Sequence, residues 1–198
     1  MKLRSSKAGL GVLAVMLAVR APSHAQETML SLDPEKTTVG FTLDATLHTV
    51  HGSFRVKSGA IRFDPSTGTA SGMVVADAAS GQTGNKKRDR TMHRDVLQSE
   101  RYPEITFTPT RIAGAVRPQG ESRVQVEGIL RLQGNDHAIA LPFQVQAMGN
   151  ELRATTQFVV PYVAWGLKNP STFFLRVADK VELSIVATGK LTSAAAQR

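Results

Sequence analysis

Apolar side chains recur at every second residue over most of this 198-residue chain, a period typical of strands with one buried face. In the longest run, residues 38–48, Val39, Phe41 and Leu43 alternate with polar side chains. Successive side chains of a strand point to opposite faces, so each run is expected to bury one face and hydrate the other. Similar runs occupy residues 54–63, 104–107, 122–132, 139–147, 152–158 and 181–185. The pattern predicts an all-β fold.

Turn signals between these runs predict about eight antiparallel strands joined by hairpins. Residues 64–68, with the sequence Asp-Pro-Ser-Thr-Gly, are the clearest of these signals. Long strands with one apolar face favour a closed barrel, because closure removes exposed edges and gives the apolar faces a common interior. A β-sandwich is the alternative. The apolar row also changes parity between Val56 and Ile61, which predicts a β-bulge or tight bend at Ser58-Gly59.

One short segment departs from the two-residue period. Between residues 80 and 103 the apolar positions follow helical spacing, at Met92, Val96 and Leu97. Thr83 or Asn85 can cap the first turn of this helix, and Pro103 is expected to stop it, because the residue before a proline disfavours helical geometry. We interpret the segment as a lid on the barrel.

The run at residues 69–79 is unusual because one of its faces carries only small side chains. These are Ala70, Gly72, Val74, Ala76 and Ala78. Small side chains leave space beside the strand, and an eight-stranded barrel is just wide enough for packed side chains or one small ligand. If side chains do not fill the interior, a long, thin, apolar molecule is the guest expected there.

Residues 1–25 have the pattern of an export signal. Lys2, Arg4 and Lys7 precede an apolar run over residues 8–19, and a small-residue cleavage site ends at Ala25. The run is too short for a membrane span, which needs about 20 apolar residues. The expected organisation is a signal peptide at 1–25, one domain at 26–190 and a flexible tail at 191–198.

Charge and cysteine content exclude several classes of protein. The predicted leader contains four of the 24 Lys+Arg residues and none of the 16 Asp+Glu residues, so the remainder carries a net charge of +4 rather than +8. A dispersed charge of this size argues against nucleic-acid binding. The chain has no cysteine, which excludes disulfides, thiolate zinc sites and a lipid-acylated N-terminal cysteine.

Several short motifs, in this order and spacing, resemble the YceI-like family of periplasmic lipid-binding proteins. They lie at residues 33–34, 39–41, 51–54, 59–64, 83–85, 88–89, 102–107 and 126–134. The resemblance runs from about Leu32 to the end of the chain. It implies a lipocalin-like antiparallel β-barrel whose lumen holds a polyisoprenoid or related long-chain amphiphile, and a periplasmic location.

The candidate ligand-binding residues are the larger apolar side chains of the inward rows and of the lid. Six are expected in the wall and three near an opening: Phe41, Leu43, Phe54, Phe107, Phe143 and Phe158, with Met92, Leu97 and Trp165. Filling the core without any ligand is the alternative role for each. The expected partner is an isoprenoid or fatty-acid-like lipid, and transient membrane contact and a homodimer are both left open.

Four cations at the start of the predicted helix could contact an anionic head group: Lys86, Lys87, Arg88 and Arg90. A positive first turn is a poor match to the helix dipole, so these side chains are expected to serve something other than helix stability. A solvated basic face is the alternative interpretation.

An enzymatic alternative depends on three histidines. His48, His51 and His93 could form a zinc site with an open fourth position if they converged at one barrel end. The chain lacks an HExxH motif and a GxSxG motif. We therefore expect a binding protein with no catalysis, cofactor or metal, and keep a metal-dependent enzyme and a purely structural protein as alternatives.

Overall fold

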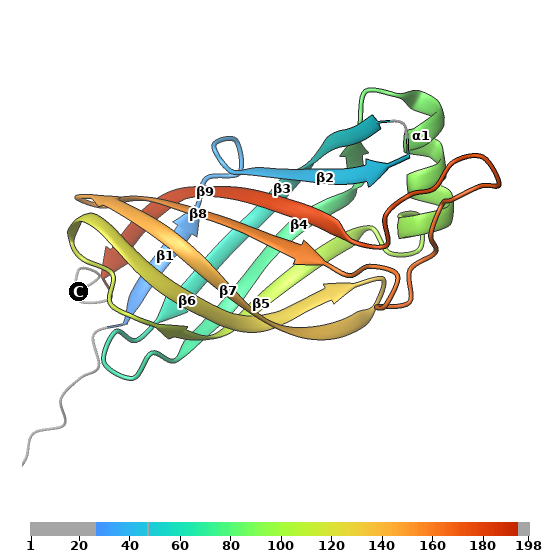
Figure 1. Cartoon of the computed structure of the whole chain (residues 1–198). Helices are drawn as coiled ribbons and strands as arrows, with labels where there is room; N and C mark the ends of the chain where they lie inside the picture. The colour runs from blue at the N-terminus through green and yellow to red at the C-terminus, as the bar shows by residue number, and fades with distance from the viewer. Residues whose placement is uncertain (1–26, 47, 194–198) are drawn as a thin grey trace, which may run out of the picture.

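A computed structural model, which describes residues 27–46 and 48–193, shows a closed antiparallel β-barrel with a helical segment at one end (Figure 1). Nine strands form its wall. They are β1 (Thr28–Leu32), β2 (Thr38–Ala45), β3 (His48–Phe63), β4 (Ala70–Gln82), β5 (Glu104–Ala113), β6 (Gln119–Leu132), β7 (Asn135–Met148), β8 (Glu151–Val160) and β9 (Val181–Ser193).

The strands close into a ring with eight positions. From β2 the order runs through β9, β8, β7, β6, β5 and β4, and β4 then pairs with β3, which pairs back with β2. Strand β1 also lies between β3 and β9: Leu32 pairs with Gly189, and Thr38 of β2 pairs with Val186. Strands β1 and β2 therefore share one position of the ring. The predicted barrel is confirmed, and the sandwich alternative is wrong.

The inward face of the barrel follows the parity that the sequence predicts. In the β6–β7 pair, Val126 lies opposite Leu141 and Val124 lies opposite Phe143, and all four side chains face the interior. The register between β3 and β4 shifts between Val56 and Ser58, so the predicted bulge is present. It allows residues of both parities in β3 to face the same interior.

The helical segment consists of the α-helix α1 (Lys86–Thr91) followed directly by the π-helix η1 (Met92–Leu97). The Asn85 side chain caps it, because its Oδ1 accepts hydrogen bonds from the backbone N–H groups of Lys87 and Arg88, both at 3.1 Å. Hydrogen bonds from i to i+5 widen the winding of η1. This winding explains why Met92, Val96 and Leu97, spaced by four and five residues, all face the barrel interior.

The segment ends earlier than predicted. Gln98, in the left-handed region with φ 48°, caps η1, whereas the sequence predicts an end at Pro103. Side-chain hydrogen bonds attach the segment to the barrel, and three of them define its position. The Thr83 N–H donates to Asp89 Oδ1 at 2.9 Å, its hydroxyl donates to the same oxygen, and Gln133 Nε2 donates to the Val96 carbonyl. The segment is thus bound both to the end of β4 and to the β6–β7 hairpin.

The expected leader at 1–25 lies outside the described residues, as do positions 194–198 of the expected tail. The sequence predicts a tail from residue 191, whereas residues 191–193 continue β9 and pair with β1. Within the described part of the chain, no helix is long and apolar enough to cross a membrane.

Candidate ligand-binding cavity

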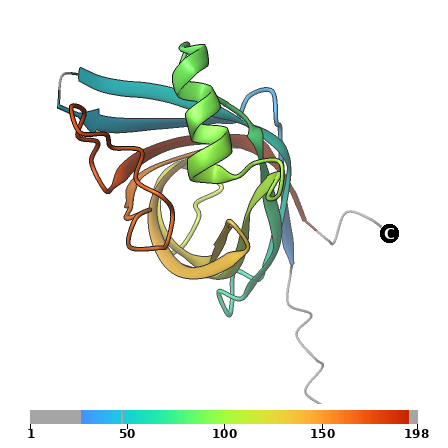
Figure 2. The same ribbon diagram turned by 90° about the vertical axis from the view of Figure 1, so that its right-hand side faces the viewer.

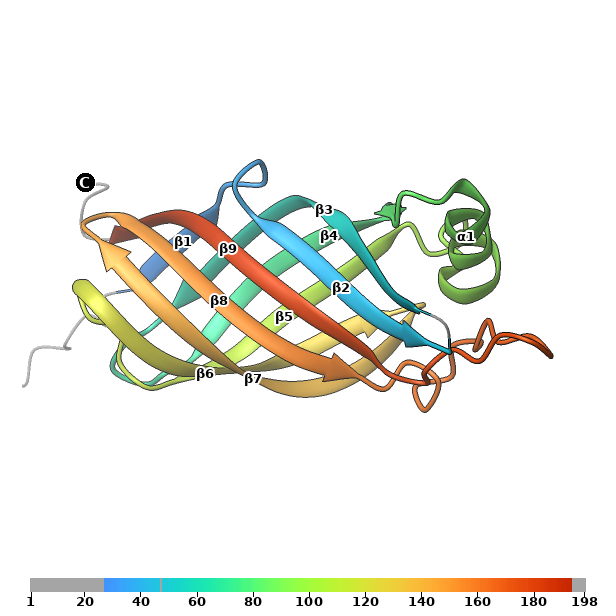
Figure 3. The same ribbon diagram turned by 45° about the horizontal axis from the view of Figure 1, so that its top comes forward.

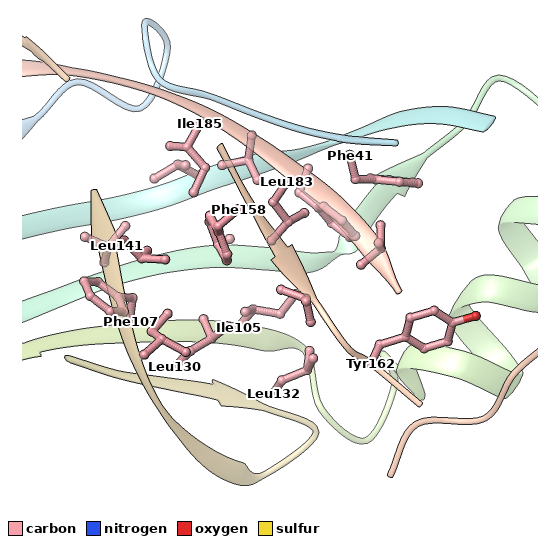
Figure 4. Close-up of a pocket in the computed structure, with 18 of the residues that line it drawn as sticks. Phe41, Ile105, Phe107, Leu130, Leu132, Leu141, Phe158, Tyr162, Leu183 and Ile185 are labelled. Atoms are coloured by element: carbon pink, nitrogen blue, oxygen red, sulfur yellow. The ribbon is translucent and has the colours of Figure 1, made fainter. Parts of the chain in front are cut away.

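The barrel encloses a cavity of about 730 Å³, and all nine strands contribute to its lining. Figure 4 shows side chains from facing strands directed into one space, among them Phe107 and Leu130 on one side and Phe158 and Leu183 on the other. The cavity extends from Met92 and Leu97, at the helical end, to residues such as Leu152 at the other end. The eight-stranded ring is therefore not filled by its own side chains.

The row of small residues on β4 contributes to this space as the sequence predicts. Val74 and Ala76 line the cavity, and Ala76 pairs with Val56 on one side and Ile105 on the other. A larger side chain at Ala76 would extend into the space between these neighbours. Ala76 is thus one of the positions that keep the lumen open.

Eight of the nine apolar candidate residues line the cavity: Phe41, Leu43, Phe54, Met92, Leu97, Phe107, Phe143 and Phe158. Trp165 does not. Its ring stacks on His137, with the two centroids 4.0 Å apart and an interplanar angle of 7°. Trp165 also packs in the cluster around Leu132 and Leu167, so its ring stabilises residues that line the mouth without lining it itself.

Most polar lining residues lie at the helical end of the cavity: His48, Thr83, Asn85, Lys87, Arg88, Thr91 and Thr172. Thr37 and Thr106 also contribute to the lining. Of the four candidate head-group cations, Lys87 and Arg88 line the cavity, whereas Lys86 and Arg90 do not. Arg88 is already engaged, because its Nε and Nη2 donate to the hydroxyl and carbonyl of Thr83 at 2.8 and 3.0 Å. Lys87 is the cation most available to a bound molecule.

The three histidines do not form a metal site. Both ring nitrogens of His93 have partners: Nε2 donates to the Gly81 carbonyl at 2.8 Å, and Nδ1 lies 3.0 Å from the Ser99 hydroxyl. His51 Nδ1 lies 3.1 Å from the Thr42 hydroxyl, and His48 alone lines the cavity. Among residues 27–46 and 48–193, no group of three or more His, Cys, Asp or Glu is placed to hold a metal ion.

The β8–β9 connection, residues 161–180, supplies cavity residues that the sequence did not reveal. Pro170, Leu175 and Val177 line the mouth from this loop, and Tyr162 and Leu167, from its first part, also line the cavity. Seen along the barrel, the loop and the helical segment stand side by side at one end (Figure 2). The loop has no repeating period, so only its apolar composition could have indicated this role.

Tyr162 is the one lining residue with a markedly shifted pKa. Its side chain is 4% exposed, and its hydroxyl donates to the Ala178 carbonyl at 2.6 Å. Burial, followed by the nearby negative charge of Asp179, raises the pKa of Tyr162 to about 12. The hydroxyl is therefore neutral at any physiological pH, and it ties the start of the loop to its end.

These features define a lipocalin-like antiparallel barrel with an internal apolar cavity that is polar at one end. The family model of the YceI-like domain matches residues 30–189. The chain therefore belongs to the YceI-like family, as its sequence motifs predict.

Solved structures show the same fold. BcnA of Burkholderia cenocepacia matches with a TM-score of 0.64 and 20% identity, over 79% of this chain and 98% of that one. A polyisoprenoid binding domain from Saccharophagus degradans matches with a TM-score of 0.64 and 16% identity, over 82% and 98%. The Campylobacter jejuni YceI protein matches with a TM-score of 0.58 and 19% identity, over 73% and 86%. Comparison with curated protein sequences gives no match.

The raised pKa of Tyr162 makes the free energy of unfolding depend on pH in the alkaline range. The unfolded tyrosine has a pKa of about 10, so the neutral hydroxyl stabilises the fold fully below pH ~10. This contribution is lost as the pH rises from about 10 to about 12. We expect the unfolding free energy of the wild type to fall more steeply in this window than that of Tyr162→Phe, measured by urea unfolding. Parallel slopes in the two proteins would contradict the assignment to Tyr162.

Proposed function

We propose that the protein is an exported carrier that holds one polyisoprenoid or similar long-chain amphiphile in its barrel lumen, without catalysis. The apolar cavity of about 730 Å³ is the observation that carries this proposal. Its volume lies within the roughly 300–1,000 Å³ range of small-molecule sites. The fold shared with a polyisoprenoid binding domain from Saccharophagus degradans supports the ligand class.

The shape of the cavity favours a long chain over a compact molecule. Strands β6 and β7 have 14 residues each; at about 3.3 Å per residue and a tilt of about 40°, they make a wall about 35 Å tall. Each buried methylene contributes about 0.8 kcal/mol. Ten such groups contribute about 8 kcal/mol, which is comparable with the roughly 4–15 kcal/mol that association costs. Such a ligand needs few specific polar contacts.

The distribution of polar residues gives the ligand a direction. The hydrocarbon chain would lie among Phe107, Phe143 and Phe158, while a polar head group would stay at the helical end beside Lys87, Thr91 and His48. The reverse orientation would bury a head group among apolar side chains, at a cost of several kcal/mol. An anionic head group is best matched, because Lys87 is a cation exposed at this end.

Export and the absence of catalysis belong to the same proposal. The signal-like pattern of residues 1–25 supports delivery to the periplasm. A carrier of a poorly soluble lipid is useful in an aqueous compartment between membranes. The polar residues at the mouth are held by structural hydrogen bonds, such as those of Arg88 with Thr83 and of Asp89 with Thr83, rather than arranged as a nucleophile and base.

Filling the lumen should abolish binding. Ala76→Trp and Ala154→Phe place large side chains in the cavity from opposite parts of the wall, and each is expected to weaken binding of a fluorescent polyprenol analogue about tenfold or more. Ala140→Trp, on the exposed face of β7, is the matched control and should bind as the wild type does. Circular dichroism would establish that each variant is folded. Unchanged affinity in both folded lumen variants would refute binding inside the barrel.

Charge reversal at the mouth separates a head-group contact from a general surface effect. Lys87→Glu should weaken an anionic polyprenyl phosphate several-fold and leave the neutral polyprenol unaffected, because Lys87 lines the cavity. The adjacent Lys86→Glu makes the same change in net charge outside the cavity lining and is the matched control. Fluorescence titration at two salt concentrations would measure the affinity of each variant for the two ligands. Equal losses in the two variants would remove the specific contact.

A further inference from the structure

The β8–β9 loop carries two large apolar side chains that no part of the described protein covers. Phe173 is 89% exposed and Phe174 is 88% exposed, whereas the other exposed large hydrophobic residues are at most 60% exposed. The two rings lie edge to face, with centroids 5.0 Å apart and an interplanar angle of 84°. They form a single aromatic knob at the tip of the loop.

The knob stands on a loop that hydrogen bonds hold in place. The Thr172 N–H donates to the Leu175 carbonyl at 2.8 Å, and the Leu175 N–H donates to the Thr172 hydroxyl at 3.2 Å, which closes the tip behind the two rings. Below the tip, the Thr46 N–H donates to the Arg176 carbonyl at 2.9 Å, and the Arg176 N–H donates to the Thr46 hydroxyl at 3.1 Å. The loop is thus fixed to the end of β2.

The same loop lines the mouth of the cavity. Its residues Pro170, Leu175 and Val177 face the lumen, while the two phenylalanines point away from it. Figure 3 shows the loop between β8 and β9 extending past the strand ends on the side where α1 lies. Whatever surface accepts the knob is therefore brought next to the cavity entrance.

Cations accompany the knob at this end of the barrel. Lys86, Lys87, Arg90, Arg176 and Lys180 are all exposed, and none forms a salt bridge with another residue in the described ranges. Three acids near the loop are exposed, Asp179 within it, Asp44 of β2 and Glu182 of β9, whereas Asp95 is already paired with Arg94 at 2.8 Å. The five exposed cations outnumber the three exposed acids, so the net charge around the knob is positive.

We infer that Phe173 and Phe174 insert into the surface of an anionic lipid bilayer and dock the cavity mouth against it. Aromatic side chains partition into the boundary between head groups and acyl chains, and each nearby Lys or Arg adds attraction to anionic lipids. This inference rests on the proposed function for its purpose, which is transfer of the guest between the bilayer and the lumen. A second copy of the chain would leave the surrounding cations unmatched, because it presents the same positive face.

Site-specific fluorescence can test insertion directly, because the chain contains no cysteine. Phe173→Cys labelled with an environment-sensitive dye should shift to shorter wavelength with vesicles containing phosphatidylglycerol, and much less with neutral phosphatidylcholine vesicles. Met148→Cys, exposed on the β7–β8 hairpin at the opposite end, is the matched control and should not shift. Equal shifts at the two positions would contradict docking through the knob.

Vesicle flotation of unlabelled protein gives the second readout. Phe173→Ser/Phe174→Ser should lower the fraction bound to anionic vesicles about tenfold or more, and Met148→Ser should not. Lys86→Glu/Arg90→Glu, at positions outside the cavity lining, should weaken binding and reduce its salt dependence. If the double serine variant binds anionic vesicles as well as the wild type does, the inference is overturned. It is also overturned if the wild type is a dimer and the variant is not, because the knob would then serve self-association.

The two proposals fail in distinguishable ways. The double serine variant should still take up a polyprenol analogue delivered in detergent, because neither phenylalanine lines the cavity. If the wild type docks on vesicles but binds no ligand in its lumen, the proposed carrier function is refuted and the inference about membrane docking stands. If the serine variant binds ligand in its lumen and docks on vesicles as well as the wild type does, only the docking inference is refuted.

Discussion

Closure of the hydrogen-bonded ring is the constraint on which the rest of the structure depends. Eight strand positions set the circumference of the wall, and backbone pairing between β3 and β4 prevents the ring from flattening into two packed sheets. The interior can then shrink only as far as its side chains allow. Because Ala76 and Ala154 face inward where larger residues would fit, the ring retains a cavity of about 730 Å³.

The two ends of this ring have different roles. At the helical end, η1 contributes Met92 and Leu97 to the lining, and the β8–β9 loop closes over the other side of the mouth. Most polar lining residues and a group of unpaired exposed cations lie at this end, so one face of the molecule has the cavity entrance, a positive surface and the aromatic knob. These three features are what a carrier needs if it exchanges a lipid with a membrane.

Much of the barrel could be predicted from the chain because strand periodicity is local. A two-residue period alone places Phe41, Phe143 and Phe158 on the inward face, and the parity change after Val56 indicates the bulge.

Irregular segments carry no comparable signal. The π winding of η1 and its end at Gln98 depend on contacts with the barrel, so the expected stop at Pro103 was wrong. Trp165 packs near the mouth, where the sequence places it, but it stacks on His137 and does not line the cavity, which no sequence period could show. The metal alternative required three histidines to converge, but ring nitrogens of His51 and His93 are engaged in hydrogen bonds, and no group of three such ligands occurs in the described part of the chain.

The central claim is that a lipid, rather than protein atoms or water, occupies the lumen in the cell. Native mass spectrometry of untagged protein purified from an exporting host, before and after extraction with organic solvent, tests it most directly. A carrier shows an excess mass of one long-chain molecule, which disappears on extraction and is recovered in the organic phase. A mass equal to that of the polypeptide at every step, with no lipid in the extract, would contradict the account.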